Sequence, residues 1–409
     1  MITILIIDYK RKKMFKKLFL GSAIVASTLT TQADTVEELS AKVDALTEEI
    51  ANMQDSSSHA LQGLNGSATY GSSMDKLSVG GYGELNYNHN VDSANPDHLD
   101  FTRAILYVGY QFSDDIKFVS EIEWEHGGYS DNTALPGGEV ILEQAFLDFK
   151  LNEMASLKVG HVLVPVGYTN LYHEPTAFRT ATRPEVERFI VPSTWHENGA
   201  ILHGSINNIS YQFGILAGLN ANNGTEVRGM RQSGKESYAD NFAFVGRVDY
   251  KSNFGFDIGT SLLTGDADQG TATLDGVKTT IGEIHAGYNL QGLRIRGMYA
   301  QSQVDNANKV AIVKATTASG EGSGYYVTAS YDVTDKWTPF VQYENYNRFD
   351  ESFAASTGAV AGSQADVTNK IVGVNFFATK NVVVKADYNF RDNQGVNDDR
   401  FEMALGYVF

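Results

Sequence analysis

The residues that could do chemistry gather in one polar stretch, residues 164–197. It contains Arg179, Arg183 and Arg188, whose forked guanidinium groups are suited to binding phosphate oxygens in pairs. Carboxylates are interspersed with them, at Glu174, Glu185, Glu187 and Glu197. The stretch could therefore bind an anionic solute, or its arginines could pair with the neighbouring carboxylates and hold the stretch folded.

Metal and enzyme chemistry have weaker support. Two His-Glu pairs, His173-Glu174 and His196-Glu197, lack the HExxH spacing of a zinc site, and the other histidines are scattered. The sequence has no Cys, so thiolate ligands and thiol nucleophiles are excluded. No signature of a nucleophile with its base is present. We expect no metal site, no cofactor and no enzyme activity.

Charge and the first residues indicate an exported protein. The chain has 32 Lys and Arg against 49 Asp and Glu, a formal net charge of −17, which makes nucleic acid an unsuitable partner. Residues 1–33 combine lysines, a short apolar run and small residues before Asp34, as a signal peptide does, and Met14 could be the true start. The run is too short to span a bilayer, which needs about 20 residues.

Two segments precede the main domain. In residues 34–54 apolar residues alternate at spacings of three and four, which predicts a short coiled-coil helix, at Val36, Leu39, Val43, Leu46, Ile50 and Met53. The alternative is one amphipathic helix packed on its own domain. Residues 55–77 are rich in Ser and Gly and are expected to form a flexible linker.

From residue 78 onward, apolar and polar residues alternate with a period of two, which predicts β-strands. Sixteen strands are expected, at 78–89, 99–112, 116–126, 139–150, 155–163, 198–206, 208–218, 241–251, 254–264, 278–290, 292–302, 324–333, 336–348, 368–378, 380–391 and 400–409. Most have lengths that suit tilted membrane strands.

The connections and the last strand favour a membrane barrel. Tight turns alternate with long polar segments at 219–240, 303–323 and 349–367, as in outer-membrane barrels. Phe401, Met403, Leu405, Tyr407 and Phe409 share one face of the last strand, which a barrel would turn toward lipid. We predict an all-β, 16-stranded antiparallel transmembrane β-barrel over residues 78–409, with a soluble sandwich or propeller as the alternative.

A barrel of this size has a lumen wide enough for water, and the long stretch 164–197 is the candidate to narrow it. The sequence resembles the phosphate-selective porin O/P family of trimeric outer-membrane porins. The motifs that carry the resemblance are GGYGELNY at 80–87, LKVGHVLVPVG at 157–167, RPEVERFIVPSTWHENGA at 183–200 and the terminal Phe409.

The resemblance implies a homotrimeric, water-filled pore in outer-membrane lipid and lipopolysaccharide of a Gram-negative bacterium, with 164–197 as a constriction loop. It implies solute-binding roles for Arg179, Arg183 and Arg188, and for three arginines of the wall, Arg103, Arg294 and Arg296. The expected function is passive diffusion of small hydrophilic solutes, including anions such as phosphate.

Three features keep other readings open. Many carboxylates share the inward parity, as Glu121 and Glu123 do, so a general or cation-preferring porin is an alternative. The acidic N-terminal helix allows a structural role, in which the barrel anchors a tether in the outer membrane. Val and Leu at the apolar positions of the N-terminal helix favour a coiled coil of two helices, whereas the resemblance implies three subunits. We give the subunit number implied by the barrel the greater weight, because its interface is much larger.

Overall fold

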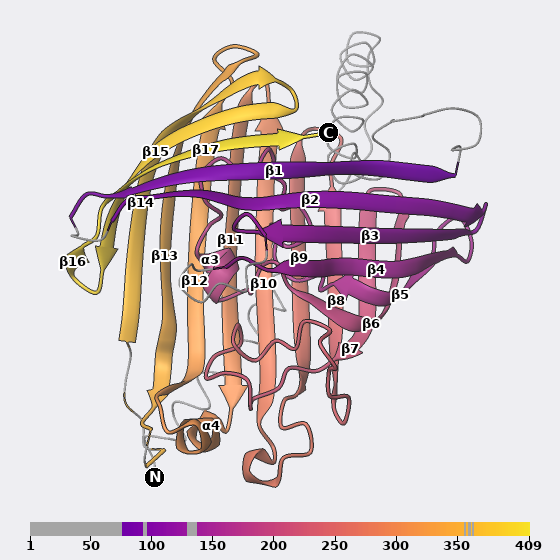
Figure 1. The fold of residues 1–409 in the computed structure, drawn as a ribbon, viewed down its shortest axis with the longest axis vertical. Coiled ribbons are helices and arrows are strands. Elements are labelled where there is room, and N and C mark those ends of the chain that lie inside the picture. The colour runs from indigo at the N-terminus through magenta and orange to yellow at the C-terminus, as the bar shows by residue number, and fades with distance from the viewer. Residues whose placement is uncertain (1–75, 93–95, 129–136, 356, 359–360, 362–363) are drawn as a thin grey trace, which may run out of the picture. The chain divides into compact units, whose positions relative to one another are not determined.

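The computed structural model describes residues 76–92, 96–128, 137–355, 357–358, 361 and 364–409 (Figure 1). The predicted signal peptide with the alternative start at Met14, the coiled-coil helix 34–54 and nearly all of the linker 55–77 lie outside the described residues. They stay predictions. Among the helices of the described ranges, none has the length and apolar content needed to cross a bilayer.

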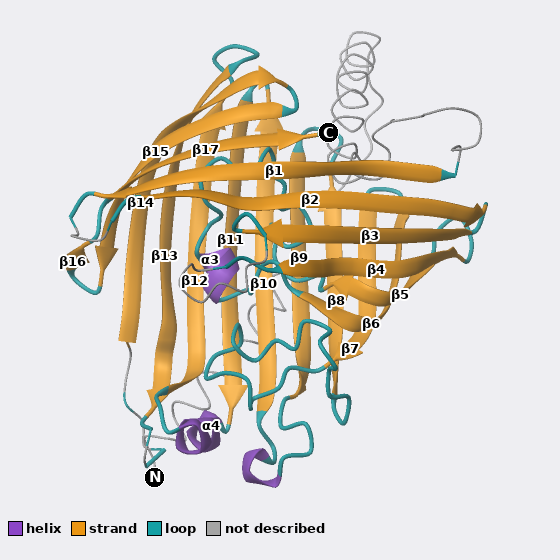
Figure 2. Cartoon of the chain, viewed as in Figure 1, coloured by secondary structure: helices purple, strands orange, loops and turns teal. Residues whose placement is uncertain are grey.

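Strands dominate the described chain, as Figure 2 shows. Alternating side chains favour this outcome, since each strand buries one face and exposes the other. The strands are β1 Leu77–Asn90, β2 His98–Ser113, β3 Ile116–Glu125, β4 Val140–Lys150, β5 Ser156–Leu163, β6 His196–Ile206, β7 Ile209–Ala217, β8 Phe242–Lys251, β9 Phe256–Asp266, β10 Lys278–Leu290, β11 Leu293–Asp305, β12 Ala318–Tyr331, β13 Trp337–Phe353, β14 Gln364–Thr379, β15 Val382–Asn393, β16 Val396–Asn397 and β17 Arg400–Val408.

These strands form one closed antiparallel sheet. Consecutive long strands pair with each other, and β1 pairs with both β2 and β17, in a register from Tyr82 opposite Val408 to Asn90 opposite Arg400. The two-residue β16 only extends the hairpin between β15 and β17. Sixteen long strands therefore close the barrel, which confirms the predicted fold class, and closure leaves no unpaired sheet edge.

The two faces of the barrel wall follow the predicted parity. On β17, Met403 and Leu405 are exposed, whereas Glu402 and Ala404 are buried on the inner side. Aromatic residues on other strands are exposed in the same way, at Trp124, Tyr250, Tyr331 and Tyr343. The apolar face of the last strand thus points outward, as a lipid-facing surface requires.

Two of the long connections expected between strands, 303–323 and 349–367, were wrong in their bounds. The segment 303–323 was expected to be one polar connection, but β11 continues to Asp305, the helix α4 spans Ala307–Lys314 and β12 begins at Ala318. β13 likewise continues to Phe353, past the expected end at 348. Backbone pairing can continue where apolar alternation stops, because ladder hydrogen bonds need no apolar face.

Candidate functional site

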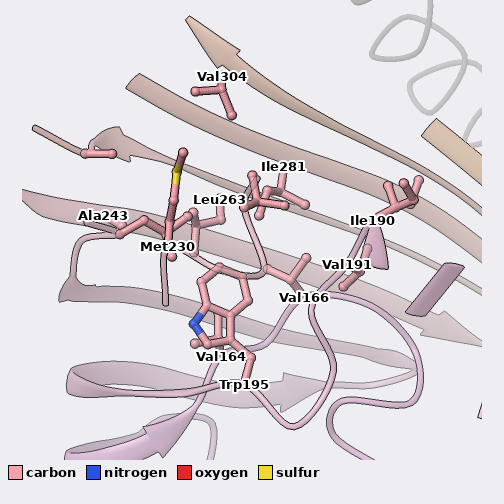
Figure 3. Packing of buried hydrophobic residues seen from close by; sticks show 14 of the residues in the cluster. Val164, Val166, Ile190, Val191, Trp195, Met230, Ala243, Leu263, Ile281 and Val304 are labelled. Carbon is pink, nitrogen blue, oxygen red and sulfur yellow. The ribbon is translucent and has the colours of Figure 1, made fainter. Parts of the chain in front are cut away.

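The long connection between β5 and β6, residues 164–195, is here called the inner loop. It is anchored by apolar side chains at both of its ends, where Val164, Val166 and Trp195 are fully buried. They belong to a hydrophobic cluster with the inward-facing Leu263 of β9 and Ile281 of β10 (Figure 3). A water-filled barrel would not need an apolar cluster in its interior. Here the cluster joins the ends of the inner loop to the wall, and burial of its side chains holds the loop in place.

Hydrogen bonds hold the first turn of the inner loop. The carboxylate of Glu187, in the short helix α3 (Val186–Phe189), accepts bonds from the backbone N–H groups of Tyr168 and Thr169 and from the hydroxyl of Tyr326, the last at 2.6 Å. Gly167 has a positive φ of 83°, which disfavours a side chain, and a Cβ there would lie 2.7 Å from Val191.

The middle of the inner loop reaches the opposite wall. The ammonium group of Lys385 on β15 donates to the carbonyls of Phe178 and Thr180, both at 2.9 Å. The N–H of Ala181 donates to Asp387 at 2.6 Å, and that of Val186 donates to Glu344 on β13 at 2.7 Å. The loop leaves β5 and contacts β13 and β15, so it crosses the interior of the barrel.

Glu185 and Glu187 of the inner loop have partners other than its arginines. Glu185 forms an ion pair with Arg391 of β15, with 2.6 Å between Oε2 and Nη1. Burial alone would raise the pKa of Glu185, but Arg391 and hydrogen bonds from Asn369 and Tyr346 lower it below the usual value. Within the described residues, Arg179, Arg183 and Arg188 form no ion pair. The sequence allowed these arginines to pair with neighbouring carboxylates of the loop. The structure shows no such ion pairs among the described residues.

The structure brings Arg179 together with two arginines of the wall, Arg294 and Arg296 of β11. Burial first, and then the positive charges of Arg294 and Arg296, lower the pKa of Arg179 to about 9. The guanidinium of Arg296 lies 3.8 Å from the centre of the Tyr168 ring, and Arg294 forms an ion pair with Asp332 at 2.9 Å. Arg179, Arg294 and Arg296 are called the wall cluster below.

A second cationic group lies where the inner loop meets the segment between β7 and β8. Arg228 donates to the carbonyl of Arg188 at 2.9 Å, and Arg231 donates to that of Thr194 at 3.0 Å. Burial, followed by the charges of Arg231 and Arg188, lowers the pKa of Arg228 to about 9. Sequence reasoning missed Arg228 and Arg231, although two arginines three residues apart in a long loop were a visible signal.

The remaining predicted residues lie apart from these groups. Arg103 is buried and forms an ion pair with Glu84 of β1, with 3.0 Å between Nε and the carboxylate. Arg183 is partly exposed, and its Nε is buried without a hydrogen-bond partner in the described chain. Solute-binding roles for all six predicted arginines stay predictions.

One group of residues could hold a metal ion. His173 of the inner loop lies beside Glu121 of β3 and Glu143 of β4, and one possible ligand atom from each lies within 4.8 Å of the others. From the sequence, His173 was considered with Glu174 and no metal site was expected. This group was missed because Glu121, Glu143 and His173 are far apart along the chain and lack a metal-binding spacing.

Together, these observations define the class: an antiparallel barrel of sixteen long strands, with an inner loop across its interior and cationic groups along that loop. The family model described as "Gram-negative porin" matches residues 152–396. An uncharacterised protein of Aquifex aeolicus (strain VF5) is 31% identical over 359 residues, which cover 81% of this chain and 80% of that protein. The chain belongs to the Gram-negative porin family, whose members are outer-membrane channels.

Solved structures show the same fold at low identity. OmpF of Salmonella typhi, in complex with daunomycin, has a TM-score of 0.57 at 14% identity and covers 81% of this chain and 97% of its own. The outer-membrane channel DcaP of Acinetobacter baumannii has a TM-score of 0.56 at 11% identity, with the same coverage. The trimer form of Vibrio cholerae OmpT has a TM-score of 0.50 at 14% identity. The narrower resemblance to phosphate-selective porins stays a prediction.

Proposed function

We propose that this porin allows passive diffusion of small hydrophilic solutes across the outer membrane, with anions such as phosphate preferred. The observation that carries the proposal is the inner loop, which crosses the barrel and holds Arg179 beside Arg294 and Arg296. Within the described residues Arg179 has no ion-pair partner, and the charges of Arg294 and Arg296 lower its pKa, so an anion entering the lumen would gain attraction there.

The chemistry of the wall cluster suits oxyanions. Guanidinium groups donate paired hydrogen bonds to phosphate oxygens and stay charged at neutral pH, even with a pKa near 9 for Arg179. Arg296 is held in place by Tyr168 and by a bond to the carbonyl of Ala177 at 3.2 Å. Diffusion down a gradient needs no cofactor and no catalytic group, only a wet and suitably charged path.

The proposal includes the oligomeric state of the protein and its export to the outer membrane. We infer a homotrimer embedded in outer-membrane lipid and lipopolysaccharide, supported by the trimer form of the structurally similar OmpT. Residues 1–33 would direct export, and the helix 34–54 would lie in the periplasm, where it could join the subunits.

A cation preference is the second candidate. Buried carboxylates line the inner face at Glu123, Glu143, Asp387 and Glu402. Asp387 already accepts a hydrogen bond from the inner loop, at Ala181, and a carboxylate that is buried has less contact with a permeating ion than one on the surface of the lumen. Arg294 is exposed and Arg179 and Arg296 are partly exposed, so the arginines are better placed to meet a permeating ion.

Current through single channels tests the proposal. The purified full-length protein in a planar lipid bilayer should give conducting steps in groups of three, and phosphate added on one side should reduce the current. Steps without phosphate block would instead indicate a general or cation-preferring porin. An absence of conducting steps would contradict the channel and favour the anchor reading.

A further inference from the structure

We propose that His173, Glu121 and Glu143 bind a first-row divalent metal ion of the Zn²⁺ type, which ties the inner loop to strands β3 and β4. This inference goes beyond the porin function and does not depend on it. The three side chains are nearly inaccessible, with exposed fractions of 2%, 0% and 1%. They come from the inner loop, β3 and β4. A metal ion bound by all three would therefore link the inner loop to these two strands.

The spacing of the ligand atoms fits a metal better than a hydrogen bond. Nε2 of His173 lies 3.4 Å from Oε1 of Glu121 and 3.4 Å from Oε2 of Glu143. Strong bonds from an imidazolium to a carboxylate are shorter, about 2.7–2.9 Å. Two ligand atoms that each lie about 2.0–2.2 Å from a tetrahedral Zn²⁺ are about 3.4 Å apart.

The other ring nitrogen of His173 sets the tautomer. Nδ1 lies 3.0 Å from the carbonyl of Asn170, which can only accept a hydrogen bond, so Nδ1 carries the proton. Asn170 is itself fixed, because its amide group donates to the carbonyls of Val164 and Trp195. In the neutral ring, the lone pair of Nε2 then faces two carboxylates. Metal-binding histidines are commonly oriented by such a bond to a backbone carbonyl.

Glu143 is the second, independent sign of a missing ligand. Both of its carboxylate oxygens are buried, and in the described chain neither accepts a hydrogen bond of good geometry; Oε2 has the 3.4 Å contact with Nε2 of His173. The side chain points into the group because β4 has a bulge there, where the pairing shifts between Glu121 and Ile122 and leaves Glu143 as the extra residue. A buried carboxylate without a good hydrogen bond is costly, and a divalent cation would offset that cost.

The surroundings of Glu121 complete the site. Its other oxygen accepts a hydrogen bond from the side-chain amide of Gln144 at 2.6 Å, which leaves Oε1 for the shared ligand. One imidazole nitrogen with two carboxylate oxygens is a donor set that suits Zn²⁺ and its neighbours, with water in a fourth position.

A second histidine provides a matched control. His285 also lies between two carboxylates, but it uses one nitrogen for each, with Nδ1 at 2.8 Å from Glu283 and Nε2 at 3.0 Å from Asp249. Those distances are typical of an imidazolium held by two ion pairs. His285 therefore needs no metal, and its replacement should leave metal binding unchanged.

Metal titration of the untagged, full-length protein in detergent tests the inference. After metal is removed with a chelator, the protein should bind one Zn²⁺ per chain tightly, and Co²⁺ in its place should give the visible absorption of a four-coordinate site. We expect His173→Gln and Glu143→Gln to weaken binding at least tenfold, and His285→Gln to leave it unchanged.

Two results would overturn the inference. One is a wild-type protein that binds Zn²⁺ no more tightly than His173→Gln. The other is a Co²⁺ spectrum of the wild type typical of six-coordinate, water-bound ion, a readout that needs no variant to fold. Both measurements are independent of conductance, so failure here is distinguishable from failure of the proposed function.

Discussion

Arg179 is the residue whose surroundings bear most directly on anion transport. Within the described residues its guanidinium makes a weak hydrogen bond, 3.4 Å from Nε to the hydroxyl of Ser330, and lies 5.9 Å from the centre of the Phe377 ring, beside Arg294 and Arg296. We expect Arg179→Gln to raise the phosphate concentration that halves the current by about three- to tenfold, a loss of about 0.7–1.4 kcal/mol. Lys336→Gln also removes one positive charge, but from an exposed turn, and should change this phosphate concentration little. Equal effects of the two variants would count against the wall cluster.

Glu174 should make the stability of the barrel depend on pH. In the metal-free protein, burial raises its pKa to about 7, while a protonated His173 opposes the shift and Glu121 adds to it. One of its oxygens is buried without a hydrogen-bond partner in the described chain. Because the folded state holds this proton more tightly than the unfolded state, stability should fall as the pH rises from about 4.5 to about 7, by at most about 3 kcal/mol.

The variant Glu174→Gln tests this pH dependence. Its thermal unfolding midpoint in detergent should fall less than that of the wild type between pH 4.5 and pH 8, because the amide does not ionise. The exposed Glu236→Gln serves as the control and should follow the wild type. Parallel curves for the wild type and Glu174→Gln would show that this carboxyl is not buried as described.

At the scale of single residues, the sequence predicted which residues could bind an anion and which side of the barrel wall they face. It did not predict which residues meet in space. Parity along β11 indicated that Arg294 and Arg296 face inward, and the loop composition indicated Arg179. Their meeting depends on where the inner loop runs, which no local pattern encodes. The same is true of His173, which lies 52 residues along the chain from Glu121.

Among the elements, the first turn of the inner loop is held by the carboxylate of Glu187. Glu187→Ala would leave two buried N–H groups and the hydroxyl of Tyr326 without their acceptor, each at a cost of about 1–3 kcal/mol. We expect faster trypsin cleavage after Arg188 in detergent, whereas Tyr326→Phe removes one bond and should have a smaller effect. Unchanged protection in Glu187→Ala would mean that the apolar anchors around Trp195 suffice.

Strand positions were the most predictable elements. All sixteen long strands lie where period-two alternation placed them, because each must present an apolar face to lipid. The errors occur beyond the apolar part of the wall, at the start of β12 and the end of β13. The helix α4 was missed because it has only eight residues, too few to show a clear helical period in the sequence. Contacts such as Lys385 with Thr180, 205 residues apart, could not be predicted.

At the scale of the whole molecule, closure and charge act together. Pairing of β1 with β17 satisfies the backbone of the last strand, and the inner loop divides the enclosed space. Although the sequence is acidic overall, with a formal net charge of −17, many inner carboxylates are buried or partnered by the loop and the wall. Net charge is therefore a poor guide to selectivity, and the accessible arginines of the path should decide it.

The reversal potential across a planar bilayer with a KCl gradient tests this claim most directly. The wild-type protein should give a potential of the sign expected when Cl⁻ permeates faster than K⁺, and Arg179→Gln should move it toward zero. A potential of the opposite sign in the wild type would contradict the account and assign the selectivity of the pore to its carboxylates.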